Sequence, residues 1–321
     1  MATDARLLER LELHKARSPR FGERLGHFLT LSDPRSVFAS DRALEGAAAL
    51  LGSDAKTYAR ASARERRRAK RLYLSAFDPR TGRKQQVVGR MSFQPWGNTV
   101  LTASMLVFSK TALQVALMQV ANQAFNASVN AINSTKRAEG SKLLRSFVSA
   151  TTAAAAVGIG LKYGTRGPAF AKLQPFIPFA AVATGQAVNV PLMRSSELEE
   201  GLLVSEAAGG KKKGRKKAVG ASRAAARKAL SEVWATRVIM AVPPMVSVPI
   251  VMDAIANSTS LLAGPQAAVA LTSLLVGLNL CVSTPLALAA FPQEGSIKAA
   301  KLEPALRSKV KAGSVTYDKG L

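Results

Sequence analysis

Side-chain amides at helical spacing are the residues of this chain whose types suggest a function. Asn122, Asn126 and Asn130 recur every four residues, so on a helix they share one face, and Gln123 adjoins them. Amides are costly against hydrocarbon unless they have hydrogen-bond partners or line a wet cavity. Because these amides end a long apolar run, the pattern predicts a membrane helix that lines a polar internal path.

Three more candidate site residues lie inside apolar runs. Lys110 is near the middle of the run at 98–122, and Asn189 and Asn279 lie in later runs. A cation at mid-membrane depth is expensive and marks a functional site by default. We expect Lys110 to receive a substrate carboxylate while the amides bind the polar remainder; the alternative is a lysine that reaches the headgroups.

Prolines interrupt the later apolar runs. A proline inside a helix removes a hydrogen bond and clashes one turn back, so the helix kinks or breaks. Transporters use such breaks to build sites at the midplane, although proline is also frequent in membrane helices generally. The candidate breaks are Pro191, Pro243, Pro244, Pro249 and Pro285.

A bundle of membrane helices must position these residues, and the predicted fold is all-α and polytopic. Runs long enough to cross a bilayer lie near 98–122, 144–162, 173–192, 235–257 and 265–291. They form a predicted bundle over 98–291, between an extramembrane helical arm at 1–97 and a tail at 292–321. Five spans would place the two ends of the chain on opposite faces. The basic loop at 193–233 would put the C-terminus on the positive-inside face.

The chain is strongly basic, with a net charge of +25. Basic stretches lie at 59–71 in the arm and at 211–217 in the loop between two apolar runs. There they act as topology signals or contact anionic headgroups. We therefore expect anionic membrane lipids as partners, and no nucleic acid.

Soluble-enzyme motifs are absent from the sequence. It contains no P-loop, no GxGxxG after a strand, no HExxH and no GxSxG. Both histidines lie in the arm and the one cysteine, Cys281, lies in an apolar run, which makes a poor ligand set for iron or haem. We predict no catalytic residue, no metal site and no cofactor.

A series of motifs runs through nearly the whole chain in a familiar order. They are FLTLSDPR (28–35), AFDPRTG (76–82), VVGRMSFQ (87–94), NQAFNASVNAIN (122–133), FVSATTAA (147–154), IPFAAVA (177–183), NVPLMR (189–194), STPLALAAFPQ (283–293) and YDKGL (317–321). In this order they resemble the sideroflexins, multi-spanning carriers of the mitochondrial inner membrane. The family's HPDTG motif stands here as DPRTG at 78–82, without its histidine.

The resemblance implies transport of small neutral amino acids, serine first, in support of one-carbon metabolism. We expect alternating access, in which the proline-broken spans expose a site lined by the amides. Two alternatives remain open at this point: a membrane scaffold or assembly factor that does not transport, and a protein of iron homeostasis.

Overall fold

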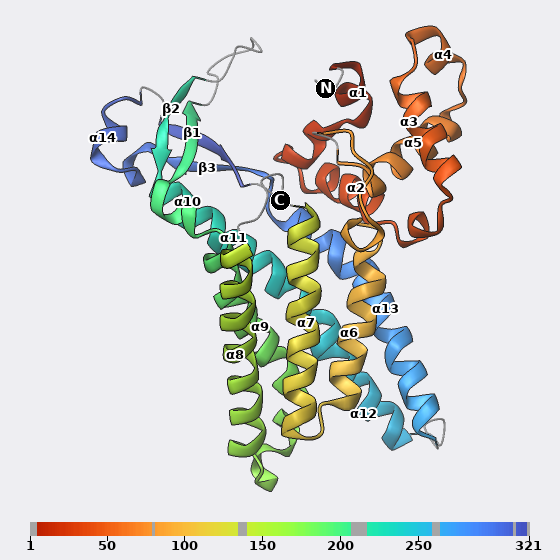
Figure 1. The fold of residues 1–321 in the computed structure, drawn as a ribbon, viewed down its shortest axis with the longest axis vertical. Coiled ribbons are helices and arrows are strands. Elements are labelled where there is room, and N and C mark those ends of the chain that lie inside the picture. Colours follow the sequence, from red (N-terminus) through yellow and green to blue (C-terminus); the bar gives the residue numbers. More distant parts are fainter. Residues whose placement is uncertain are drawn as a thin grey trace.

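The computed structural model describes residues 5–78, 81–133, 140–206, 217–258, 264–310 and 313–319. Pro79 and Arg80 of the DPRTG motif and residues 211–216 of the lysine-rich run lie outside these ranges. The fold is an all-α polytopic membrane bundle, with a helical arm and a small sheet at one end (Figure 1).

Four helical stretches are long and apolar enough to cross a membrane: 140–164, 168–193, 223–258 and 265–290. They overlap the last four predicted spans. They correspond to α8 (Gly140–Gly164), η4 with α9 (Pro168–Phe176 and Ile177–Met193), α11 to α12 (Arg223–Val242 and Val248–Ser258) and α13 (Pro265–Ala290).

The predicted first span needs correction, because 98–122 is not one helix. α6 (Gln94–Phe108) and α7 (Ala112–Asn133) run in opposite directions beside each other, joined by a turn at 109–111 (Figure 1). The turn is fixed by Gln114, whose Oε1 accepts from the backbone N–H of Lys110 and of Thr111, at 3.0 Å each. The backbone N–H of Gln114 in turn donates to Oγ1 of Thr111. This reciprocal capping begins α7, so the apolar run contains a helical hairpin.

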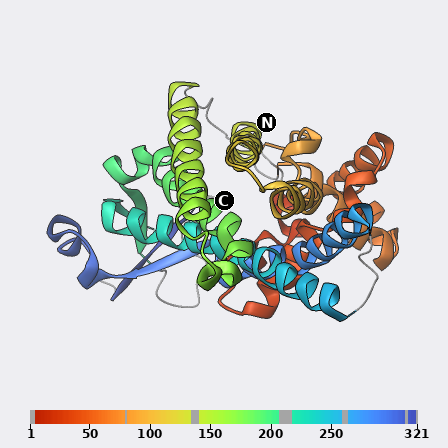
Figure 2. The ribbon, with the colours of Figure 1, turned by 90° about the horizontal axis from the view of Figure 1, so that it is seen from below.

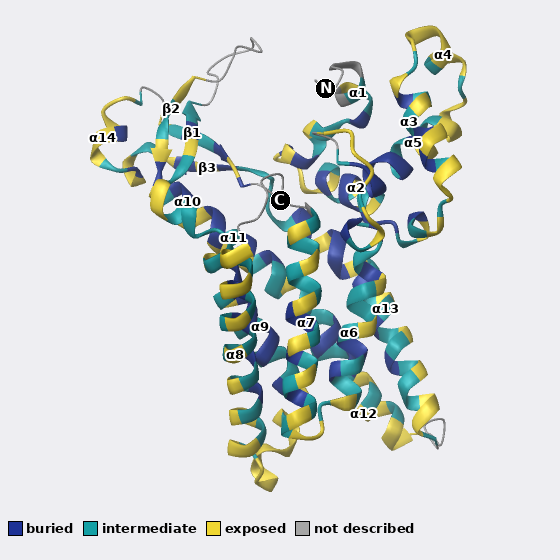
Figure 3. Ribbon diagram, viewed as in Figure 1, coloured by how far each residue is buried: buried dark blue, intermediate teal, exposed yellow. Residues whose placement is uncertain are grey.

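The helices of the bundle pack in a ring. Each helix contacts the next in the order α6, α7, α8, α9, α11 and α13, and α13 packs against α6 to close the ring. Figure 2, seen from the end of the bundle away from the arm, shows α7 next to α6 and α13 beyond α6. Exposed residues lie along the outer faces of α8 and α13 (Figure 3), as expected for helices that face lipid.

The candidate proline breaks have different outcomes. Pro243 and Pro244 open a π-helical segment, Pro243–Ser247, that separates α11 from α12, and Pro249 lies in the first turn of α12. Pro191 and Pro285 break nothing, because α9 and α13 continue through them. Only the Pro243–Pro244 pair therefore marks an interruption of the helical ladder, and it does so as a π segment rather than as an unwound break.

The predicted loop at 193–233 and the predicted tail are not irregular where the structure describes them. α10 (Ser195–Glu200) follows α9, and two short strands, β1 (Leu202–Glu206) and β2 (Ala218–Ser222), precede α11. They join β3 (Glu294–Lys298) and β4 (Ser314–Asp318) of the tail in an antiparallel sheet of order β2-β1-β4-β3. A short helix, α14 (Pro304–Arg307), lies between the last two strands in sequence. The sheet and α11 bury a core that includes Val204, Ala229, Leu230, Val315 and Tyr317.

The arm folds as short helices around its own apolar core. Its elements are α1 (Ala5–Leu11), η1 (Leu13–Arg17), α2 (Phe21–Leu31), η2 (Pro34–Phe38), α3 (Asp41–Gly52), α4 (Ala55–Arg60), α5 (Ala63–Ala76) and η3 (Val87–Gly89). Leu11, Leu44, Leu51 and Leu72 pack together in its core. α2 attaches the arm to the bundle, since Phe28 packs with Leu288 and Ala289 of α13.

The arm, the sheet and both chain termini lie at the same end of the bundle (Figure 1). The four stretches long enough to span are even in number, and the two ends of the chain lie at one end of the bundle instead of on opposite faces. This corrects the topology expected from the sequence.

Candidate functional site

Buried amides from two adjacent helices form a polar layer inside the bundle. Gln119, Asn122 and Gln123 of α7 and Asn189 of α9 are each at most 5% exposed. Several of their polar atoms have no hydrogen-bond partner within the described chain: Oε1 of Gln119, Nδ2 of Asn122, both amide atoms of Gln123 and Oδ1 of Asn189. Each such atom costs about 1–3 kcal/mol when it is left unsatisfied. A group of them in one layer is therefore a candidate ligand site.

A glycine brings the two helices close enough for this layer to form. A Cβ on Gly185 of α9 would lie 2.4 Å from Nε2 of Gln123 and 3.2 Å from Cβ of Ala154 in α8. The small residues of α8 and α9 let their backbones approach, as is common in membrane helix pairs. The Gln123 amide therefore lies directly against the backbone of α9.

A cavity of about 250 Å³ adjoins this layer, between α6, α7, α8 and the η4–α9 segment. Gln119 lines it, four residues and so about 6 Å along α7 from Gln123. Met105, Val115, Gly158 and Ala181 also line it, and Nε2 of Gln119 contacts Sδ of Met105 at 3.8 Å. The cavity thus reaches the polar layer through one turn of α7.

Lys162 is the charged residue among those that line the cavity. It is in the last turn of α8, and its ammonium group donates to the backbone carbonyl of Ser109, 2.8 Å away, in the α6–α7 turn. An ammonium group has three donors, and this contact uses one of them. The cavity therefore offers a cation near one end and amides at the other, which suits a small ligand that carries both a carboxylate and polar groups.

The structure brings together only some of the residues that the sequence pointed to. Asn122, Gln123 and Asn189 belong to the buried polar layer. Asn126 is half-buried and donates to the backbone carbonyl of Asn122, and Asn130 is half-buried. The predicted stripe therefore does not line the cavity along its length.

Asn279 and Lys110 lie elsewhere. Asn279 of α13 accepts from Oγ of Ser247 in the π segment, at 3.3 Å, and donates to the carbonyl of Leu275. Lys110 is exposed in the α6–α7 turn and is not at mid-helix depth. The counter-charge role predicted for Lys110 does not fit this position, because the hairpin moves it to the end of the bundle.

Sequence reasoning missed Lys162 as a site residue because it ends a predicted span, where lysine usually reaches the headgroups. The role of Gly158, one turn earlier, is visible only in the structure. A Cβ there would lie 2.9 Å from Val115 and 3.2 Å from Ala181, so α8 approaches α7 and α9 closely at that level.

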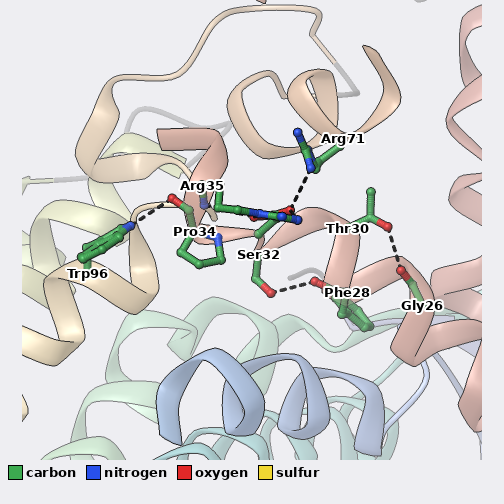
Figure 4. Close-up of polar contacts among 9 residues, drawn as sticks. Gly26, Phe28, Thr30, Ser32, Pro34, Arg35, Arg71 and Trp96 are labelled. Carbon is green, nitrogen blue, oxygen red and sulfur yellow. Dashed lines mark hydrogen bonds and ion pairs between the residues drawn. The ribbon is translucent and has the colours of Figure 1, made fainter. Parts of the chain in front are cut away.

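The SDPR segment belongs to a second polar cluster, which lies in the arm (Figure 4). The Asp33 carboxylate accepts from Arg35 and from Arg71 of α5, with the shortest contact at 2.7 Å, and the hydrogen bonds from Arg35 lower its pKa. The indole Nε1 of Trp96 in α6 donates to the carbonyl of Pro34 at 3.0 Å. These contacts join η2 to α5 and α6, so the cluster fastens the arm to the first bundle helix.

Across the described ranges, no group of three or more His, Cys, Asp or Glu side chains could hold a metal ion.

Known proteins resemble this chain along nearly its whole length. The family model described as "SFXNs: Sideroflexins" matches residues 16–321. Sideroflexin-3 of Bos taurus is 37% identical over 311 residues, which cover 93% of both chains. Sideroflexin-1 of Homo sapiens is 35% identical over 309 residues, again 93% of both chains. Sideroflexin-2 of Mus musculus is 35% identical over 294 residues, 90% of this chain and 88% of its own. No solved structure matches the chain.

Proposed function

The chain belongs to the sideroflexin family, and we propose that it transports small neutral amino acids, serine first, across the mitochondrial inner membrane in support of one-carbon metabolism. The observation that carries this proposal is the cavity that begins beside Lys162 and ends at Gln119, whose Oε1 is unpartnered, one turn of α7 from the unpartnered amide of Gln123. Lys162 is the residue that would receive the substrate carboxylate. The amides would bind the ammonium and hydroxyl groups, because each amide both donates and accepts.

The size of the cavity supports a small substrate. Pockets for drug-sized ligands span about 300–1,000 Å³, and this cavity is smaller. Its other lining residues are all uncharged: they are apolar residues together with the polar Ser109, Gln119 and Gln174. They leave no counter-charge for a second net charge on the substrate. A zwitterion with a short side chain fits these conditions.

The scaffold alternative makes a different demand on the amides. A scaffold would bury them in hydrogen bonds between helices, whereas Gln119 lines a cavity and Gln123 has two unpartnered amide atoms. This difference favours the carrier.

The test is uptake of radiolabelled L-serine into proteoliposomes by the wild type, Lys162→Gln and Lys110→Gln. Lys110 is a matched control, since it lies at the same end of the bundle but does not line the cavity. We expect saturable uptake by the wild type, a half-saturation concentration about tenfold higher or more in Lys162→Gln, and little change in Lys110→Gln. Absence of saturable uptake of serine, alanine and glycine by the folded wild type would refute the carrier function.

The arm and the start of α6 carry an exposed apolar surface that suits contact with lipid. We also propose that the edge of the arm at η2 and α6 lies in the headgroup layer of an anionic membrane. Phe38 is 74% exposed, and its ring lies edge-on to Trp96 with the ring centres 5.4 Å apart. Val100, one turn after Trp96, is 67% exposed and continues this apolar face down α6. The Arg35 side chain is 78% exposed beside them. Exposed aromatic rings flanked by arginine are typical of membrane interfaces.

A further inference from the structure

Arg237 is a cation inside the bundle whose donors are mostly unused. It lies on α11, in the stretch at 223–258 that is long and apolar enough to cross a membrane. One of its terminal nitrogens donates to Oε1 of Gln186 on α9, at 2.9 Å. Within the described chain, no carboxylate lies within ion-pair distance of Arg237. A guanidinium group has five N–H donors, so this one retains unfilled capacity for an anion.

The direction of the Arg237 side chain distinguishes it from an arginine that reaches the headgroups. Such an arginine extends to the surface of the membrane, whereas Arg237 reaches across to a buried amide of the neighbouring helix. A charged group held inside a membrane bundle is expensive and is retained where it acts.

The contacts of α9 place Arg237 next to the polar layer. Ala181 lines the cavity, Gly185 lies against Gln123 one turn later, and Gln186, the partner of Arg237, follows directly. Asn189, with its unpartnered Oδ1, lies almost one turn further on. The Gln186 backbone is therefore about 7.5 Å beyond Ala181 along the helix axis, on the side toward the arm.

We propose that Arg237 is a second carboxylate-binding residue on the substrate path. It would receive the carboxylate after Lys162, when the substrate moves past Gln119 and Gln123 toward the arm end of the bundle. Two guanidinium N–H groups can bind a carboxylate in a bidentate way, and Gln186 holds the group in place while no substrate is there. This inference rests on the proposed amino-acid transport and adds a second anion site to it.

The two sites predict different kinetic defects. Loss of the first site weakens substrate capture, so Lys162→Gln raises the half-saturation concentration. Loss of the second site impairs a later step, so Arg237→Gln lowers the maximal rate of serine uptake about tenfold or more while the half-saturation concentration changes little. Arg237→Lys keeps the charge and loses the bidentate geometry, and its rate should fall between those of the wild type and Arg237→Gln.

The experiment compares these variants in proteoliposomes, with Arg227→Gln as control because Arg227 is an exposed arginine of the same helix. A wild-type maximal rate in Arg237→Gln would overturn the inference and leave the carrier function standing. If Arg237→Gln does not fold, Arg237→Lys decides, and a wild-type rate in that variant has the same meaning. A wild type that takes up no serine would instead refute the carrier function, and the second site with it.

Discussion

At the scale of single residues, Gly185 determines where the Gln123 amide lies. Its hydrogen leaves the space that Nε2 of Gln123 occupies, and a Cβ there would lie 2.4 Å from that nitrogen. Because Nε2 is at the end of a flexible side chain, a methyl group displaces the amide more readily than it separates the helices.

We therefore expect Gly185→Ala to reduce serine uptake strongly while it destabilises the protein by only about 1 kcal/mol. Uptake and the melting temperature in detergent are measured together. Gly160→Ala in α8 is the control, since a Cβ at Gly160 meets nothing within 4 Å. Equal uptake by the two alanine variants would show that the Gln123 amide does not act in transport.

We expect His27 to make the stability of the arm depend on pH. Burial in α2 lowers its pKa to about 4, helped by the charges of Lys70 and Lys15, and its Nδ1 has no partner in the described chain. The folded state keeps the imidazole neutral, whereas the unfolded chain takes up a proton near pH 6.5. The free energy of unfolding therefore falls as the pH is lowered from about 6.5 to about 4, by about 3 kcal/mol in total.

This fall is measured as the change in melting temperature of the detergent-solubilised protein between pH 7 and pH 4.5. His27→Leu should reduce the change, and His14→Leu, at the other and exposed histidine, should not. Hydrogen bonds lower the pKa of the Glu12 and Asp33 carboxylates, so their protonation adds to the loss of stability below pH 4.5. An undiminished change in His27→Leu would contradict the assignment.

At the scale of helices and strands, the α6–α7 hairpin marks how far the sequence could predict the fold. The four later spans follow from length and hydropathy alone, because a helix of that length must be apolar to cross a bilayer. The hairpin did not, since its turn at 109–111 contains no glycine or proline and apolar residues flank it on both sides. The Thr111–Gln114 capping pair was the readable signal.

The central pairing of the sheet could not be predicted because its two strands are distant in sequence. β1 is five residues long and pairs with β4, whose residues lie more than one hundred positions later. Strand pairing at such separation leaves no local periodicity to read. The sequence shows Arg237 near the start of an apolar run, where it reads as a side chain that reaches the headgroups. Its partner Gln186 lies on another helix, and only the fold brings the two together.

The contact between η2 and α6 yields a prediction about lipid. With Cys281→Ala as background, Phe38→Cys labelled with NBD should show blue-shifted emission that spin-labelled lipids quench and aqueous iodide does not. Ala59→Cys, labelled in the same way, is the control, because it is exposed on α4, far from the bundle in Figure 1. Equal quenching of both labels by iodide would place Phe38 in water and remove the lipid contact.

At the scale of the whole molecule, two different parts of the chain connect the helices of the ring at their arm-side ends. The sheet connects the arm-side ends of α9, α11 and α13, because β1 follows α9 and α10, β2 precedes α11 and β3 follows α13. Lys319 strengthens this connection through its buried ion pair with Glu232 of α11. The α6–α7 hairpin is outside the sheet and connects instead to the arm. A movement of the hairpin against the other helices would open or close the cavity, which lies between them.

The central claim is that the cavity beside Lys162 is the substrate site, and substituted-cysteine accessibility tests it most directly. In the Cys281→Ala background, Ser109→Cys places a thiol at the cavity wall with almost no change in size. Ser258→Cys is the matched control at the same end of the bundle, on the exposed end of α12. We predict that a small methanethiosulfonate reagent abolishes serine uptake by Ser109→Cys, that excess serine slows this inactivation, and that Ser258→Cys is unaffected. Inactivation of Ser109→Cys at the same rate with and without serine, or none at all, would contradict the claim.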